Sequence, residues 1–195
     1  VCDSKFGDRV DAAMFDRLRG MRLPTLDEGV SDSMRAAIEA ARADGDSVGG
    51  AIECAVVGVP AGVGEPFFDS VESRISALAF SVPAVKAIAF GKGYELCGMR
   101  GSEANDSLYF DGDVVRARTN HNGGVIGGIT DGMPIVFEVA IKPTASVFKT
   151  QDTVDVVEKK DAKLTLKGRH DPCIVTRAVP VIEAVAAIAV CDLMR

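Results

Sequence analysis

Residues 177–195 read RAVPVIEAVAAIAVCDLMR, a run that is apolar on most of its circumference when it is wound into a helix. Pro180 is compatible with that helix if it falls in the first turn. A helix this apolar must be buried between layers of structure or against another subunit. The stretch therefore predicts a layered fold in which the C-terminal helix lies inside.

The segments upstream predict which layers surround that helix. Residues 1–44 form a charged helical lead-in, with Ser31 or Ser33 as a candidate helix cap, and we separate it from a main unit, 45–195. An amphipathic helix follows in EPFFDSVESRISALAFSVPAV, residues 65–85, with Phe68 and Ile75 on its apolar face. Strands are expected over Ala51–Val59, 85–91, 114–120 and 134–143, and a hairpin over Thr153–Leu166.

Several strands follow one another without an intervening helix. This order favours an α+β fold with antiparallel sheets over a doubly wound parallel sheet. The chain has 195 residues and a net charge of -6, and an acidic balance argues against general nucleic-acid binding. No run of 18 uncharged apolar residues occurs, so we expect no membrane-spanning helix.

Five cysteines and two histidines are scattered without a C-x-x-C pair, so a zinc site is not expected. The unpatterned cysteines are interpreted as reduced thiols of a cytoplasmic protein, buried as small apolar residues.

Glycines dominate RTNHNGGVIGGITDGMP, residues 118–134. Backbone N–H groups left bare by glycine can receive a planar or charged ligand, but the same glycines can simply form tight turns. The spacing fits neither a P-loop nor a dinucleotide-binding fingerprint. Both interpretations remain open on this stretch alone.

A second candidate is IKPTASV, residues 141–147, at the end of an expected strand. Lys142 supplies a point charge, Thr144 and Ser146 supply hydroxyl groups, and Pro143 fixes the turn. This set suits a phosphate or a ring oxygen, although an ordinary solvated turn has a similar composition.

The third candidate is KGRHDPCIVTRAVPV, residues 167–181. Arg169 can bind a carboxylate or phosphate through its forked guanidinium, and Asp171 can orient that fork or accept a proton. Alternatively, Arg169 and Asp171 pair with each other. His170 is either a general acid or base or a structural hydrogen-bonding group. Nearby basic residues suggest a local positive field that attracts an anion: Arg100, Arg116, Arg118, Lys167 and Arg177.

These stretches, with GDSVGG at 45–50, MRGSEANDSLYF at 99–110 and QDTVD at 151–155, occur together in one order. In that order and spacing the chain resembles the chorismate synthase family from about Gly45 to its end. The resemblance implies a β-α-β sandwich with helices packed between antiparallel sheets, assembled as a homotetramer.

The resemblance also implies a cofactor, a substrate and site residues. Reduced FMN is expected at Pro83, Ala84, Gly127, Lys142, Pro143, Thr144, Ala145, Ser146 and Arg169. Arg169 is also expected to contact the substrate, 5-enolpyruvylshikimate 3-phosphate. Asp171 is expected to help the flavin N5 act as a base. The implied reaction is a redox-neutral 1,4-anti elimination of phosphate that gives chorismate, in the shikimate pathway to the aromatic amino acids.

The family's N-terminal half carries a Gly-Glu-Ser-His-Gly motif and two histidines assigned as acids, and none of these is present here. His121 and His170 therefore do not take over those roles. The chain begins with Val1 and ends within an apolar helical pattern, so we expect it to be the second half of a longer protein and inactive in isolation. A non-catalytic binding or assembly module that retains the fold is the alternative. Whether NADPH or an outside reductant reduces the flavin stays open.

Overall fold

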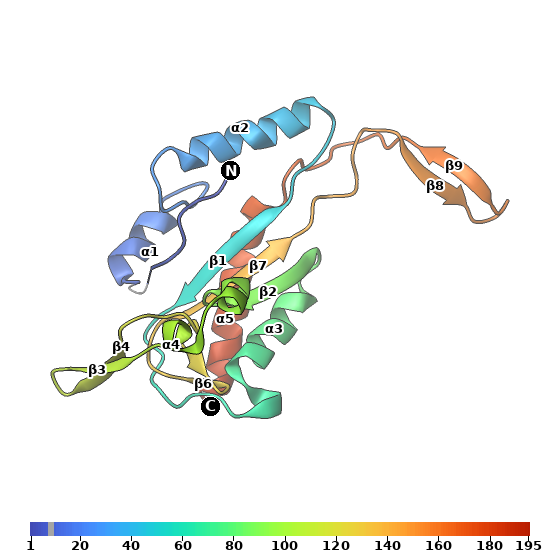
Figure 1. Ribbon diagram of the computed structural model, residues 1–195. Coiled ribbons are helices and arrows are strands. Elements are labelled where there is room, and N and C mark those ends of the chain that lie inside the picture. The colour runs from blue at the N-terminus through green and yellow to red at the C-terminus, as the bar shows by residue number, and fades with distance from the viewer. Residues whose placement is uncertain (8–9) are drawn as a thin grey trace.

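A three-stranded sheet forms the centre of the computed structural model, which describes residues 1–7 and 10–195 (Figure 1). The strand order is β1-β7-β2, with β1 at Gly50–Val56, β7 at Ile135–Ile141 and β2 at Val85–Phe90. Both outer strands run antiparallel to β7 and therefore parallel to each other. The middle strand thus comes from a part of the chain that follows both of its neighbours.

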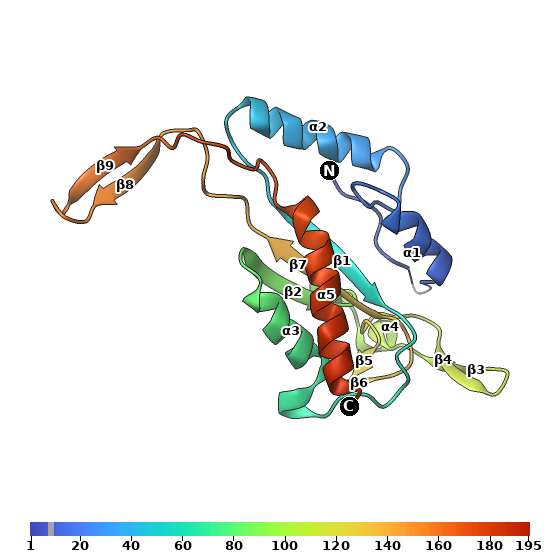
Figure 2. The ribbon, with the colours of Figure 1, turned by 180° about the vertical axis from the view of Figure 1, so that it is seen from behind.

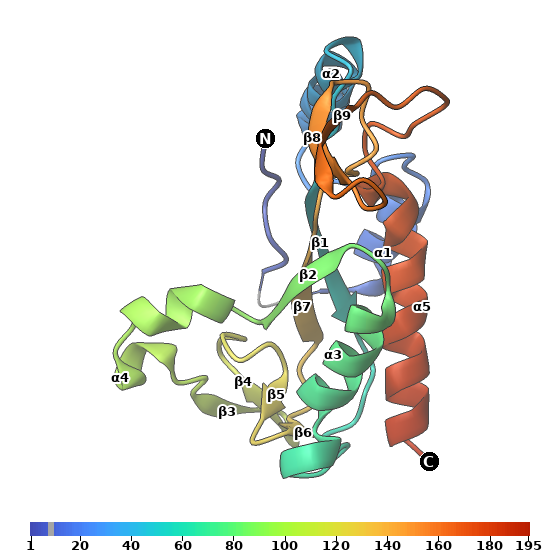
Figure 3. The ribbon, with the colours of Figure 1, turned by 90° about the vertical axis from the view of Figure 1, so that its right-hand side faces the viewer.

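Two helices cover one face of this sheet. Helix α3 (Val71–Ser81) packs on β2, α5 (Val175–Leu193) packs on β1, and the helices pack on each other (Figures 2 and 3). Alternate residues of β7 point toward them, as the period of two in a strand requires. Phe137 and Val139 in β7 are fully buried and meet Ile75 from α3 and Ile182 from α5 in one core.

The expected C-terminal helix is present but begins earlier than predicted. Helix α5 starts at Val175, so Pro180 lies inside the helix and not in its first turn. Proline has no N–H to donate to the Thr176 carbonyl one turn back. The position is tolerated because Pro180 lies on the exposed side of α5.

The helix layer is covered on one side only within the described residues. In this layer Phe80 of α3 and Val181 and Ile188 of α5 remain 52%, 43% and 60% exposed. Figure 3 shows no second sheet over the other side of the layer among the residues drawn with a described placement. The mixed α+β class with antiparallel sheets is confirmed, and this chain supplies one sheet and the helix layer.

The remaining elements extend from this centre. Helices α1 and α2 lie upstream of the sheet, and three separate hairpins, β3–β4, β5–β6 and β8–β9, leave it (Figure 1). The bounds are α1 (Ala12–Arg19), α2 (Val30–Ala43), η1 (Phe67–Asp69), η2 (Gly93–Gly98), α4 (Gly101–Ala104), β3 (Leu108–Asp111), β4 (Val114–Ala117), β5 (Val125–Ile126), β6 (Ile129–Thr130), β8 (Gln151–Asp155) and β9 (Lys160–Leu164). The predicted strands and the predicted C-terminal hairpin are all present, the latter as β8–β9.

Two local predictions were wrong at helix N-termini. Gly29, with φ 79, occupies the cap of α2, and Ser31 and Ser33 lie inside its first turn. Helix α3 begins only after Ser70, whose hydroxyl accepts the Ser73 N–H. Phe68 precedes this cap and is 92% exposed, so it does not belong to the apolar face of α3.

The cysteines are free thiols, as expected, but not all of them are buried. Cys54 and Cys173 are buried, whereas Cys2, Cys97 and Cys191 are exposed. Burial raises the pKa of the Cys54 thiol to about 12. Cys54 therefore behaves as a small apolar residue of the core.

Candidate functional site

Three loops meet at one end of the central sheet. The loop before β1 (45–49), the residues before β2 (Pro83 and Ala84) and the turn after β7 (142–148) lie together there because β7 is antiparallel to both neighbours. The Lys142 N–H donates to the Ala84 carbonyl at 2.9 Å. The Ser47 hydroxyl donates to the Thr144 carbonyl at 2.6 Å. The backbone of the second candidate stretch is therefore fixed at Lys142 and Thr144 by this junction.

The third candidate stretch joins the same end. The Val48 N–H donates to the Pro172 carbonyl at 2.8 Å, which fixes the segment before α5 beside the start of β1. Ser146, Arg169 and Asp171 then line one cavity of about 280 Å³. Ser146 and Arg169, from two separate stretches of the sequence, thus line a common cavity.

Ala84 holds a strained backbone at this junction. Its φ is 74, in the left-handed region that costs a residue with a Cβ on the order of 1–2 kcal/mol. The turn orients the Ala84 carbonyl toward the Lys142 N–H. The strain is therefore associated with the connection between the start of β2 and the end of β7.

The carboxylates at the cavity are already paired. Asp171 Oδ2 contacts Arg177 Nη2 at 2.5 Å, and its Oδ1 accepts the Cys173 N–H at 3.2 Å. The interpretation that Asp171 pairs with Arg169 is therefore wrong. Asp46 contacts Lys149 Nζ at 2.8 Å, and hydrogen bonds from Lys149 and from the Ser47 N–H lower the pKa of Asp46.

Several cationic and hydrogen-bonding side chains in these loops have no partner among the described residues. Among the described residues, neither Arg169 nor Lys142 forms an ion pair. Thr144 Oγ1 and His170 Nε2 are both enclosed by protein, and neither atom has a hydrogen-bond partner among the described residues. Buried polar atoms are normally satisfied, so these two atoms fit a site that is completed by a polar ligand. A phosphate-bearing cofactor such as FMN has the charge and the acceptors that this set requires.

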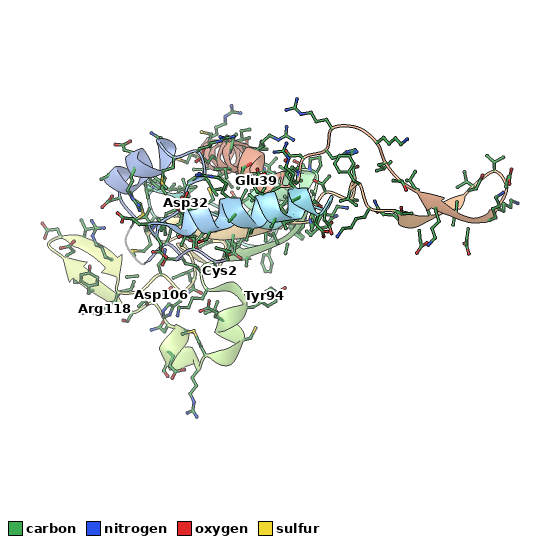
Figure 4. The ribbon with its side chains drawn as sticks, turned by 90° about the horizontal axis from the view of Figure 1, so that it is seen from above. Cys2, Asp32, Glu39, Tyr94, Asp106 and Arg118 are labelled. Atoms are coloured by element: carbon green, nitrogen blue, oxygen red, sulfur yellow. The ribbon has the colours of Figure 1, made fainter. Side chains whose placement is uncertain are left out.

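Most of the Gly-rich stretch has a structural role. The buried Asp106 carboxylate accepts hydrogen bonds from Thr119 Oγ1, the His121 N–H, and both the backbone and side-chain nitrogens of Asn122, at 2.7–2.9 Å. Burial raises the pKa of Asp106, but these hydrogen bonds outweigh it and leave the pKa below its usual value. In Figure 4, Asp106 lies between the β3–β4 hairpin and the α4 region.

Gly127 lies apart from the other proposed site residues. The tight β5–β6 hairpin packs on the N-terminus of α3, where the Val71 N–H donates to the Gly128 carbonyl at 3.0 Å. Pro83 and Ala84 follow the other end of this 11-residue helix. At 1.5 Å per residue, about 16 Å of helix separates the two places. A ligand that contacts both Gly127 and Ala84 must span about this length or reach Gly127 on another copy.

Only part of the expected basic cluster gathers here. Arg116 pairs with Asp111 at 3.0 Å, and Arg118 lies 4.9 Å from the centre of the Tyr109 ring. Both belong to the β3–β4 hairpin, which projects away from the site (Figures 1 and 4). Their charge is therefore used within that hairpin. Neither Lys167 nor Arg177 lines the cavity; Arg177 pairs with Asp171 at its edge, and Arg100 is the N-cap of α4.

Sequence reasoning missed two residues of these regions. Arg42 lines the cavity from the last turn of α2, and Asp106 organises the Gly-rich stretch from 13–16 residues upstream. A basic residue at a helix end just before GDSVGG was a visible signal for Arg42. Asp106 gave none, because an isolated Asp is common before a turn.

Metal-binding clusters and membrane-spanning helices can both be assessed within the described residues. No cluster of three or more potential metal-ligating side chains occurs there. No helix in the same residues is long and apolar enough to cross a membrane.

The amino-acid sequence matches a known family. A family model described as chorismate synthase matches residues 9–194. The chain belongs to the chorismate synthase family. The match begins well before Gly45, where the visible resemblance starts, and so includes most of the helical lead-in.

Individual relatives agree with this assignment. A chorismate synthase of Korarchaeum cryptofilum is 44% identical over 182 residues, which are 93% of this chain and 50% of the relative. A chorismate synthase of Chitinophaga pinensis is 52% identical over 157 residues, which are 80% of this chain and 47% of the relative. The chain thus spans about half the length of the curated relatives it matches.

A solved structure supports the fold directly. The crystal structure of a chorismate synthase superimposes with a TM-score of 0.67 and 28% identity, over 83% of this chain and 41% of that chain. The sheet and its helix layer therefore correspond to part of a larger chorismate synthase fold.

Proposed function

We propose that this chain is the C-terminal half of an FMN-dependent chorismate synthase. The complete enzyme would convert 5-enolpyruvylshikimate 3-phosphate to chorismate by 1,4-anti elimination of phosphate, in the shikimate pathway. The observation that carries the proposal is the cavity lined by Arg169, which forms no ion pair among the described residues, and by His170, whose Nε2 has no partner there. The turn after β7, which carries Lys142 and Thr144, lines the same cavity through Ser146. These positions fall in the stretches that the family resemblance assigns to flavin and substrate.

The cations would bind and neutralise the ligands. Two phosphorylated compounds bring several negative charges, which repel one another in a pocket with little water. Arg169 can bind a phosphate or carboxylate oxygen pair through its fork, and Lys142 adds a point charge. Pro83, Ala84, Gly127 and the turn from Pro143 through Thr144 and Ala145 to Ser146 would hold the flavin.

Asp171 has a separate role in the proposal. Bound reduced flavin would supply electron density as phosphate leaves the substrate and a nitrogen, N5, that accepts the substrate proton. Arg177 and the Cys173 N–H hold the Asp171 carboxylate in one orientation at the cavity edge. From there we assign it the role of assisting N5 as a base.

The half-length match supports a proposal about what else the activity needs. Because the relatives are about twice as long, we propose that the chain alone is inactive and that an N-terminal half supplies the acids. We also propose a homotetramer in the cytoplasm. NADPH is one candidate source of reducing equivalents for the flavin.

A chimera tests this function. This chain would replace the matching segment of the Chitinophaga pinensis relative, with which it is 52% identical. With reduced FMN under anaerobic conditions, we expect the chimera to release phosphate and chorismate in equal amounts, and the chain alone to release neither. Asp171→Asn in the chimera should lower turnover by about 100-fold with near-normal flavin affinity, since general acid–base catalysis raises reaction rates by about 10²–10⁴-fold.

The result separates the two interpretations of the chain. A chimera that folds and binds flavin but yields no chorismate would favour a non-catalytic module. Unchanged turnover of the Asp171→Asn chimera would remove Asp171 from the mechanism.

A further inference from the structure

A second guanidinium lines the cavity beside Arg169. Arg42, in the last turn of α2, shares this cavity with Ser146 and Arg169. Its only ion pair within the described chain is with Glu39, one turn earlier, at 3.6 Å on the exposed surface. An exposed pair of this kind contributes little, so the Arg42 guanidinium is available to a ligand at small cost.

The end of α2 is fixed to the rest of the site. Gly45 adopts φ +67 directly after the helix, and its carbonyl accepts the Phe148 N–H at 2.9 Å. Lys149 pairs with both Asp44 and Asp46 at the same place. Arg42 therefore belongs to a wall that is attached to the turn after β7.

His170 adds a third potential donor to the cavity. Its ring meets the Phe148 ring edge to face at 5.2 Å between centroids, which limits its rotation. His170 Nε2 is enclosed without a hydrogen-bond partner among the described residues. Donors from α2, from the turn after β7 and from the segment before α5 thus surround one space.

The charges of the side chains around this cavity favour an anionic ligand. Asp46 and Asp171 are already paired, with Lys149 and Arg177 respectively, so they contribute little free negative charge. Arg169 has no ion pair among the described residues, and Arg42 has only the exposed pair with Glu39, so both guanidinium forks are available. A phosphate monoester carries two negative charges and oxygen pairs that match guanidinium forks.

We propose that Arg42 and Arg169 together clamp the phosphate of a phosphate monoester, with His170 Nε2 as a further donor. The inference rests on the proposed function, because both FMN and 5-enolpyruvylshikimate 3-phosphate are phosphate monoesters. It adds Arg42 and His170 to the residues that bind them.

Flavin titration of the 195-residue chain tests the clamp. The fluorescence of FMN, and of riboflavin as the analogue without phosphate, would be followed for wild type, Arg42→Gln and Arg35→Gln. Arg35 is the matched control: it lies on the same helix, pairs one turn back with Asp32 at 3.4 Å, and does not line the cavity. Arg42→Gln should weaken FMN binding by about tenfold, as expected for loss of one charge-assisted contact, and change riboflavin affinity less than twofold.

The controls define the contradicting outcomes. Equal losses for FMN and riboflavin would overturn the clamp, since they would mean that α2 had shifted. The clamp would also be overturned if Arg42→Gln bound both FMN and 5-enolpyruvylshikimate 3-phosphate as tightly as wild type, with the substrate affinity measured by calorimetry. A loss for the substrate alone would support the clamp and identify its phosphate as the one bound.

One further variant separates this inference from the proposed function. Arg169→Ala that binds both phosphate esters as tightly as wild type would contradict the proposed site itself. Weakened binding in Arg169→Ala with normal binding in Arg42→Gln would contradict only the two-arginine clamp. A wild-type chain that binds neither ester would overturn the clamp, while the chimera assay would still decide the function.

Discussion

The Asp106 carboxylate accepts four hydrogen bonds from three residues of the Gly-rich stretch, and its side chain is only 1% exposed. Because the pKa of folded Asp106 lies below its usual value of 3.8, the carboxylate contributes its full stability above that value. The contribution is lost as the pH falls below about 4 and the folded group becomes protonated.

Asp106→Asn should therefore be less stable at neutral pH, by about 2–3 kcal/mol for lost charged hydrogen bonds. Thermal unfolding followed by circular dichroism from pH 7 to pH 2.5 should show the difference from wild type shrinking below pH 4. Asp111→Asn, which removes an exposed carboxylate from the β3–β4 hairpin, is the control and should change little. A deficit that persists unchanged at pH 2.5 would show that Asp106 acts through packing and not through its charge.

At the residue scale, the sequence identified the proposed site from its chemistry. Lys142 and Arg169 stood out because cations in an acidic chain, next to Pro and Gly turns, suit an anion. Residue types do not reveal pairing, however, and so Arg177 was not recognised as the partner of Asp171. The alternative that the glycines are structural holds at Gly123, where a Cβ would lie 2.4 Å from the Gly91 nitrogen.

At the element scale, β2 ends where backbone from the Gly-rich stretch approaches it closely. A Cβ on Gly91 would lie 2.1 Å from the His121 carbonyl oxygen, and Gly91 has φ +54. The Gly91 N–H donates to the Val136 carbonyl, and the Lys92 N–H to the His121 carbonyl, both at 2.9 Å. Glycine at this position thus connects β2, β7 and the Gly-rich stretch.

Gly91→Ala should destabilise the chain by more than about 3 kcal/mol, because left-handed strain is added to a backbone clash. Gly112→Ala is the matched control: its φ is +61, but nothing lies within 4 Å of the added methyl group. The control should cost about 1–2 kcal/mol. Urea unfolding of both variants measures the two costs, and equal losses would contradict a role for close approach.

Strands and helices were predictable where periodicity alone decides them. Loose alternation predicted the β8–β9 hairpin, and the apolar run predicted α5. Helix starts depend on backbone geometry that periodicity does not encode, so Gly29 replaced the serines as the cap of α2 and Phe68 fell outside α3. The start of α5 was misplaced for the same reason, since proline allows a helix to begin before it but does not require it.

At the scale of the whole molecule, the helix layer leaves apolar side chains uncovered. Phe80 of α3 and Val181 and Ile188 of α5 are exposed. A surface of this kind is typical of an interface. The chain spans about half the length of the relatives it matches. If the proposed function holds, we expect a second half to cover this surface.

We expect the isolated chain to self-associate through this surface. Ile188→Glu should shift it toward monomer in sedimentation velocity, because burying an unpaired carboxylate in an interface is costly. Val157→Glu, at the exposed tip of the β8–β9 hairpin, is the control and should sediment as wild type. Identical sedimentation of wild type and Ile188→Glu would contradict an interface on this face.

The middle position of β7 has a consequence for synthesis on the ribosome. Strands β1 and β2 emerge first, yet Gly50 finds its partner only when Ile141 has been made. Until then both strands keep an unpaired inner edge, and pairings this distant in sequence form slowly. The nascent chain therefore passes through a stage in which it depends on chaperones or on early collapse to avoid aggregation.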